Sequence, residues 1–140
     1  MPSLDNMMLR QIIMDHYENP RNHELVEDDS YKKVNMDSET CIDNIDIQAK
    51  IENGVIEDIR FDGEACAICT SSTSIMTELL IGKTIDEARV IIENYMNMIF
   101  EKDYDPEILE EAIAFYNTHK QANRIKCATL GWKGITQLID

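Results

Sequence analysis

The stretch that decides the fold is IDIQAKIENGVIEDIRF, residues 45–61. Apolar and polar residues alternate on both sides of Asn53-Gly54, as in strands with one buried face, and Asn-Gly is typical of a hairpin turn. A two-residue turn would set the apolar faces out of step, so the pattern favours a three-residue loop with Gly54 left-handed in a bulge. The expected pairs are Ile51 with Val55, Ile47 with Ile59, and Ile45 with Phe61.

Helical spacing and capping signals surround this hairpin. Pro20 ends a first helix because the residue before proline avoids the α conformation, and Gly82 is a natural C-cap for a second. Thr84 and Glu87 form a capping box that opens a third, and Pro106 suits the first turn of a fourth. The expected helices are 4–19, 66–81, 84–100, one starting at 105–106, and 127–139.

Residues 31–36 are expected to add a short edge strand to the hairpin. The sequence therefore predicts an α+β fold, a small antiparallel three-stranded sheet packed against several helices. The chain has 140 residues and shows neither a repeat nor a Gly/Ser linker, so a single domain, 1–140, is expected.

Charge and composition narrow the function. The formal charge of −14 comes from 13 basic and 27 acidic residues, which disfavours nucleic acid and anionic membranes and favours a protein with a basic docking patch. The start of the chain lacks the pattern of a signal peptide, so a cytoplasmic location is expected. Because that compartment keeps thiols reduced, the four cysteines indicate metal binding or thiol chemistry.

Three potential metal ligands converge at one end of the expected hairpin. Extending the register places Asp43 opposite Gly63, and Cys41 opposite Ala65, one residue from Cys66. Cys41 and Asp43 share a strand face because they are two residues apart, and opposed residues lie about 5 Å apart.

Cys127 is the fourth candidate, although the hairpin geometry cannot place it. Three thiolates and one carboxylate suit Zn²⁺ and equally a small iron–sulfur cluster. Cys66 and Cys127 are both expected near helix starts, where the dipole favours thiolate, and Arg124 and Lys126 are expected to offset the anionic ligands. Spacing alone leaves structural zinc, functional metal or sulfur chemistry, and unliganded thiols open.

Two further residues have plainer interpretations. Cys66 and Cys69 form a CxxC, but without the βαβ context of a redox dithiol, so Cys69 is expected to be a packed residue or a spare thiol. His16 lies on the apolar face of the first helix and is expected to be a hydrogen-bonded core histidine.

Four segments resemble one known family. They are RQIIMDHYENPRN (10–22), CID (41–43), GEACAI (63–68) and RIKCATLGW (124–132). Together they are similar to the SufU-type branch of the IscU/NifU N-terminal-like proteins of iron–sulfur cluster assembly. Lys126 stands where IscU-type scaffolds carry histidine, their Leu-Pro-Pro-Val-Lys chaperone site is missing, and residues 84–120 look like the SufU-type insertion.

The resemblance implies an IscU-like fold and a zinc-dependent sulfurtransferase that accepts persulfide sulfur from a pyridoxal-phosphate cysteine desulfurase of SufS type. It implies that Cys41, Asp43, Cys66 and Cys127 hold Zn²⁺. Cys127, displaced from the metal by a desulfurase side chain, would accept the sulfur, and Arg124 would position the exchange. Downstream cluster-assembly proteins would be further partners. The alternative is a scaffold on which a [2Fe-2S] cluster is assembled and handed on.

Three positions depart from the family pattern. Ile42 and Ala65 stand where the family usually has glycine. These two residues make the ligand loops stiffer than glycine would. Cys69 stands where it usually has serine, which adds a thiol one helical turn from Cys66.

Overall fold

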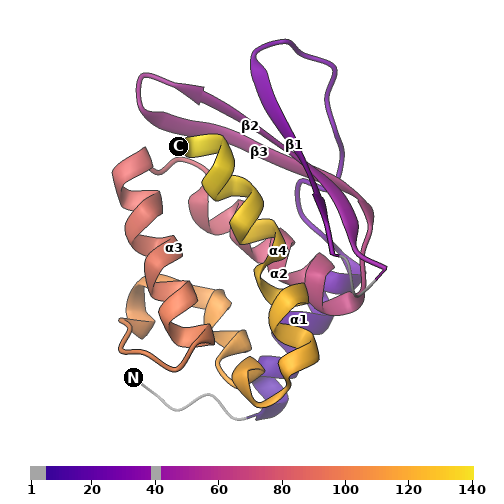
Figure 1. Cartoon of the computed structure of the whole chain (residues 1–140), viewed down its shortest axis with the longest axis vertical. Coiled ribbons are helices and arrows are strands. Elements are labelled where there is room, and N and C mark those ends of the chain that lie inside the picture. Colours follow the sequence, from indigo (N-terminus) through magenta and orange to yellow (C-terminus); the bar gives the residue numbers. More distant parts are fainter. Residues whose placement is uncertain (1–5, 39–41) are drawn as a thin grey trace.

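The computed structural model describes residues 6–38 and 42–140, in which helices pack against a small twisted sheet (Figure 1). The elements, in chain order, are α1 (Asn6–Glu18), β1 (Tyr31–Asp37), β2 (Asn44–Glu52), β3 (Val55–Glu64), α2 (Ala67–Leu80), α3 (Ile85–Ile99), the 3-10 helices η1 (Pro106–Phe115) and η2 (Thr118–Lys120), and α4 (Ala122–Ile139). The predicted α+β class with a three-stranded antiparallel sheet is confirmed.

The sheet has the order β1-β2-β3, with both neighbouring pairs antiparallel. Its apolar face is buried, with Ile45, Ile47 and Ala49 at most 1% exposed. Helix α4 packs on β1 and β2, and α2 packs on β3 and α4. One end of the sheet is thereby held against the start of α2 (Figure 1).

The predicted hairpin register is wrong by two residues. Glu52 pairs with Val55 across a two-residue turn, in which Asn53 and Gly54 both have positive φ, 54° and 74°. Such a turn matches the twist of the strands. The mismatch of apolar faces is absorbed in β3, where Glu57 is an extra residue between the Ile51–Ile56 and Lys50–Asp58 pairs.

The corrected register moves the end of the hairpin. Ile45 lies opposite Gly63 and Asn44 opposite Glu64. Asp43 is therefore next in line with Ala65, not with Gly63 as predicted, which is two residues closer to Cys66. The expected position of Cys41 falls outside the described residues.

Two helices differ from expectation at the chain's C-terminal end. Helix α4 begins at Ala122, five residues before the predicted start at Cys127, so Cys127 lies in its second turn. The helix that opens at Asp105-Pro106 is a 3-10 helix, interrupted at Glu110, where φ is 47°. The predicted start of the first helix at residue 4 lies outside the described residues. The other boundaries agree within two residues, and the predicted capping box of Thr84 and Glu87 is present.

The core is one cluster of buried side chains drawn from the helices and the sheet. Trp132 of α4 and Tyr95 of α3 are fully buried and stack with ring centroids 3.8 Å apart. Within residues 6–38 and 42–140, none of the helices combines the length and apolar character needed to cross a bilayer.

Candidate metal centre

Asp43, Cys66 and Cys127 meet where the sheet ends and α2 begins. One ligand atom from each lies within 4.8 Å of the other two. The residues come from the segment before β2, the start of α2 and the second turn of α4. The structure thus brings together three of the four predicted ligands, and Cys41 lies outside the described residues.

Asp43 is bound directly to the start of α2. Its side chain is fully buried, Oδ1 accepts a hydrogen bond from the Cys66 backbone N–H at 2.8 Å, and Oδ2 lies 3.9 Å from the Cys66 thiol. Burial of a carboxylate costs free energy unless strong partners compensate it. Oδ2 faces a thiol, which is a weak hydrogen-bond donor, so a bound cation would stabilise this oxygen.

Cys66 occupies the N-cap position of α2. Its φ and ψ are −69° and 172°, and its Sγ accepts a hydrogen bond from the Cys69 backbone N–H at 3.4 Å. The predicted position at a helix start, where the dipole favours negative charge, is confirmed for this cysteine.

Cys127 differs from that prediction. It lies beyond the first turn of α4, where the dipole effect has largely decayed, and its thiol is 3.8 Å from the Asn123 carbonyl oxygen. Only 6% of the residue is exposed. Cys127 owes its place in the group to helix packing.

A buried polar network sets that packing. The Ser72 and Tyr95 hydroxyls donate to the Ala128 carbonyl at 2.6 and 2.7 Å, and the Trp132 ring N–H donates to Ser72 at 3.0 Å. The network locks α4 against α2 directly beside Cys127. The sequence analysis missed it, although the run of serine and threonine at 70–74 within an apolar helix was an available signal.

Gly131 allows the close approach of the same two helices. A Cβ at this position would lie 2.4 Å from Thr73 Oγ1, well inside van der Waals contact. The absence of a side chain at Gly131 therefore lets α4 bring Cys127 down to Cys66.

The donor set fits zinc. Ligands of one tetrahedral Zn²⁺ lie roughly 3.3–3.8 Å apart, and the 3.9 Å between the Asp43 oxygen and the Cys66 sulfur is close to that separation. Two thiols and one carboxylate supply three positions, and the predicted Cys41 would supply a fourth. Thiolate ligands also suit iron–sulfur clusters, so the donors alone do not distinguish the two.

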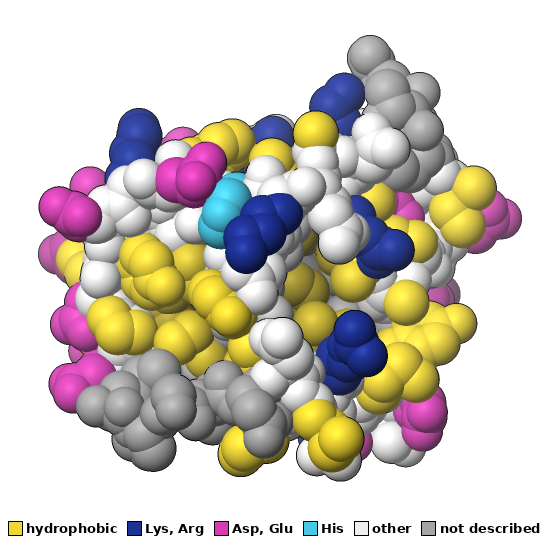
Figure 2. Space-filling model, turned by 90° about the horizontal axis from the view of Figure 1, so that it is seen from below, with side chains coloured by type: hydrophobic (Ala, Val, Ile, Leu, Met, Phe, Trp, Pro, Cys, Tyr) yellow, Lys and Arg dark blue, Asp and Glu magenta, His cyan; other side chains and the backbone are white. Residues whose placement is uncertain are grey.

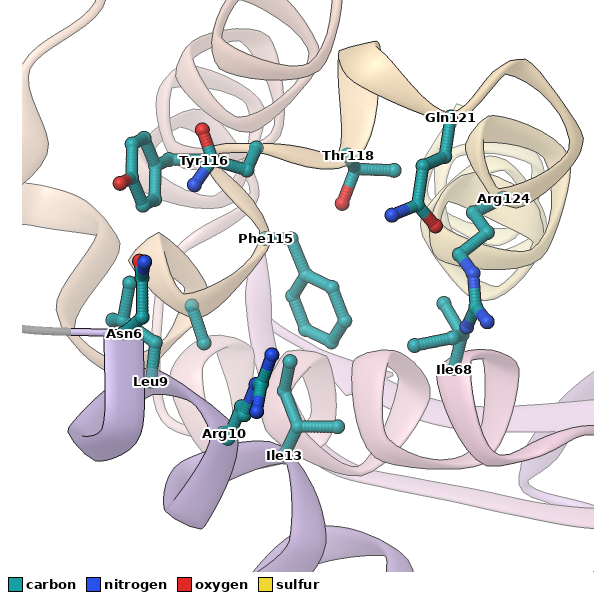
Figure 3. A pocket seen from close by; sticks show the side chains of 12 residues that line it. Asn6, Leu9, Arg10, Ile13, Ile68, Phe115, Tyr116, Thr118, Gln121 and Arg124 are labelled. Atoms are coloured by element: carbon teal, nitrogen blue, oxygen red, sulfur yellow. The ribbon is translucent and has the colours of Figure 1, made fainter.

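Arg124 precedes Cys127 by one turn of α4. It is exposed and lines a cavity of about 350 Å³ together with Ile68 and Phe115, as Figure 3 shows. Lys126 is also exposed. Their predicted role in offsetting the ligand charge stays a prediction.

The two plainer interpretations agree with the structure. Cys69 is fully buried and is not part of the ligand group. His16 is fully buried as well, with Nδ1 2.8 Å from the Ser74 hydroxyl and Nε2 3.3 Å from Glu111. It is the hydrogen-bonded core histidine that was expected.

Comparison with known proteins identifies relatives over nearly the whole chain. The family model for the NifU-like N terminal domain matches residues 8–139. The zinc-dependent sulfurtransferase SufU of Bacillus subtilis is 40% identical over 129 residues, which cover 91% of this chain and 86% of that protein. The iron-sulfur cluster assembly scaffold protein IscU of Streptococcus pyogenes is 32% identical, over 96% of this chain and 84% of its own.

A solved structure has the same fold as this chain. A putative iron-sulfur cluster assembly scaffold protein for the SUF system, from Fervidobacterium islandicum, superposes with a TM-score of 0.85 at 30% identity. The match covers 93% of this chain and 95% of that one. From the shared fold, the match over residues 8–139 and these identities, we conclude that the chain belongs to the family of NifU-like N-terminal domains.

Proposed function

We propose that this protein is a zinc-dependent sulfurtransferase, which accepts persulfide sulfur from a cysteine desulfurase during iron–sulfur cluster biogenesis. The observation that carries the proposal is the meeting of Asp43, Cys66 and Cys127 within 4.8 Å. The 40% identity to a protein named as a zinc-dependent sulfurtransferase supports it. The donor would be a pyridoxal-phosphate enzyme of SufS type, and the setting the cytoplasm, where thiols stay reduced.

Cys41, Asp43, Cys66 and Cys127 would hold the zinc ion. Bound zinc would keep its cysteine ligands as thiolates and so supply nucleophiles at neutral pH. The chain's own contribution is to exclude water, since Asp43 and Cys127 are buried, and to fix the carboxylate through the Cys66 N–H.

Sulfur transfer needs one of these thiolates to attack the outer sulfur of the donor's persulfide. The new S–S bond forms as the donor's S–S bond breaks, and the donor cysteine leaves as a thiolate. Cys127 is the predicted acceptor, with Arg124 as the positioning residue. Because Cys127 is only 6% exposed, its thiol has to become accessible when the donor docks. Cys41 must therefore be tested in parallel.

The second candidate function is a scaffold for a [2Fe-2S] cluster. It is favoured by the 32% identity to an iron-sulfur cluster assembly scaffold protein over 96% of this chain and by donors that suit either metal. The lysine at position 126, in place of the histidine of IscU-type proteins, counts against it.

The deciding experiment adds the purified protein to a cysteine desulfurase with cysteine and follows sulfide or alanine release. We expect a large stimulation that Cys127→Ala abolishes, and a persulfide that mass spectrometry locates on Cys127. A persulfide on Cys41 would reassign the acceptor. An unchanged rate, together with a stable cluster after anaerobic reconstitution with iron and sulfide, would favour the scaffold.

A further inference from the structure

A groove lies between α1, the η1–η2 segment and the start of α4. Its volume is about 350 Å³, and apolar side chains form its floor, among them Leu9, Ile13, Ile68 and Phe115. Arg10 and Arg124 enter it from α1 and α4, on either side of Phe115 in Figure 3. The described residues that line it include no aspartate or glutamate.

These two arginines differ from the other three. Arg21, Arg60 and Arg89 each lie within 4.0 Å of a carboxylate. Within residues 6–38 and 42–140, neither Arg10 nor Arg124 forms an ion pair or a side-chain hydrogen bond. In a chain with 27 acidic and 13 basic residues, two unpaired guanidinium groups around one groove favour an anionic occupant.

Arg10 also belongs to an exposed stripe along α1. Met7, Arg10, Met14 and Tyr17 are spaced by three or four residues, so they share one face of the helix. Met7, Met14 and Tyr17 are 69%, 48% and 45% exposed. Exposed methionine, tyrosine and arginine are typical of protein interfaces, and this stripe continues beyond the groove.

The charge on this side of the molecule is uneven. Figure 2 shows a face whose centre is mainly apolar (yellow) and also carries Lys and Arg side chains (dark blue). The acidic side chains (magenta) lie mostly towards its edges. This face suits an acidic partner, although the chain's overall charge of −14 favours a basic one.

We propose that the groove and the α1 stripe are the docking site for an acidic, partly apolar segment of the sulfur-donor protein. A carboxylate of that segment would lie between Arg10 and Arg124, and a neighbouring apolar side chain would cover Phe115. The proposal rests on the proposed function, because the groove adjoins the thiols. Ile68 follows Cys66 by two residues, and Arg124 precedes Cys127 by one helical turn.

The alternatives fit the observations less well. A second copy of the chain would bring the same two arginines to the contact, and these guanidinium groups would repel one another. A small free carboxylate would satisfy the guanidinium groups but would leave Met7, Met14 and Tyr17 uncovered.

The test measures the concentration of this protein that gives half-maximal stimulation of the desulfurase. Calorimetry in the same buffer measures binding of the two proteins without turnover. We expect Arg10→Glu to raise the half-saturating concentration about tenfold or more and to leave the rate at saturation unchanged, as loss of a charge contact at an interface does. Arg10→Lys should restore much of the affinity, and Met14→Ser should weaken it about threefold.

Lys32→Glu is the matched control, since Lys32 is exposed on the edge strand β1 and the charge change is identical. The proposal requires that this variant stay within about twofold of wild type. Thermal unfolding of each variant verifies folding.

Each outcome has one meaning for the docking site. Wild-type stimulation with unchanged affinity in Arg10→Glu would overturn the docking site and leave the sulfurtransferase standing. Binding that depends on Arg10 and Met14 without stimulation would support the docking site and reject the sulfurtransferase. A loss in Arg10→Glu with none in Met14→Ser, or a self-association that Arg10→Glu abolishes, would overturn the proposed occupant.

Discussion

Among residues 6–38 and 42–140, two regions each place three potential metal ligands within 4.8 Å of one another. The thiol cluster consists of Asp43, Cys66 and Cys127, and the histidine cluster of His16, Glu78 and Glu111. By distance alone the two are equivalent. They differ in what else their donor atoms contact.

The histidine cluster is satisfied by protein groups. His16 contacts the Ser74 hydroxyl and Glu111 with its two ring nitrogens, and the Arg21 guanidinium lies 3.7 Å from Glu78. The two carboxylates are about half exposed, at 46% and 50% of their side chains, so water also solvates them. A cation would have to compete with all of these partners.

The thiol cluster is more deeply buried, and the second oxygen of its carboxylate has only a weak partner. Asp43 is fully buried, and the contact of its Oδ2 with the Cys66 thiol is 3.9 Å long, where sulfur is only a weak hydrogen-bond donor. Proximity alone therefore nominates both clusters as metal sites, whereas the buried and weakly satisfied carboxylate oxygen of Asp43 favours the thiol cluster.

The largest expected effect is the loss of zinc from Cys66→Ser. Wild type should carry about one zinc per chain, and the variant less than about a tenth, because one of four ligands is gone. At zinc a thousandfold above its Kd, wild type should also lose about 4 kcal/mol of unfolding free energy on chelation. Elemental analysis and thermal unfolding with and without chelator test this.

Cys69→Ser is the control for that experiment, because Cys69 is a neighbouring thiol outside the cluster. It should retain the zinc. Stoichiometric zinc in Cys66→Ser would show that the thiol cluster is not the metal site.

The next effect separates stability from metal binding. His16→Ala should lower the unfolding free energy by about 2–4 kcal/mol, since it leaves a cavity and deprives Ser74 and Glu111 of their partner, yet zinc content should stay the same. Denaturant unfolding and elemental analysis measure the two. A second zinc in wild type that His16→Ala removes would show that the histidine cluster is also a metal site.

A smaller effect is expected at the helix contact behind the thiol cluster. Gly131→Ala should cost about 1–3 kcal/mol through overpacking and should weaken zinc binding, because its Cβ would collide with Thr73 and push α4 away from α2. Thermal unfolding and chelator competition test this. The double variant with Thr73→Ala should recover part of both losses, and purely additive losses would refute the steric explanation.

The smallest expected effect is on stability at high pH, and it comes from Tyr31 in the sheet. A hydrogen bond to Asp58 raises the pKa of Tyr31 to about 12 from the usual 10.0. The folded state then holds this proton more tightly than the unfolded state, so the pair's stabilisation is complete below pH 10 and is lost as pH rises towards 12. Tyr31→Phe should flatten the decline in denaturant-derived stability over that window. An unchanged slope would show that other groups cause the decline.

Most of the fold could be predicted because its signals are local. Alternation in β2 and β3, the capping box at Thr84 and the left-handed Gly82 that follows the C-cap of α2 each depend on neighbouring residues only. The register could not be predicted, since a two-residue turn with a downstream bulge at Glu57 and a three-residue loop satisfy the same pattern. Both keep the apolar faces together.

The site was predictable to a different extent at each residue. Asp43 and Cys66 followed from the hairpin even with its wrong register, because the error of two residues preserved the face. Cys127 was a candidate from its residue type and its expected place near a helix start, but the hairpin could not place it, and only the family resemblance joined it to the other ligands. Its position depends on Gly131, Ser72 and Tyr95, which are contacts between helices far apart in sequence.

The extra residue in β3 also determines which changes of length the hairpin can survive. Removing Glu57 would leave the Lys50–Asp58 pair and all pairs beyond it in place, so Asp43 would still arrive beside Cys66. Removing one residue between Ile59 and Gly63 would instead turn the end of the strand over, because successive side chains point to opposite faces. A single-residue deletion in β3 thus keeps Asp43 beside Cys66 when it falls at the bulge, and not when it falls between Ile59 and Gly63.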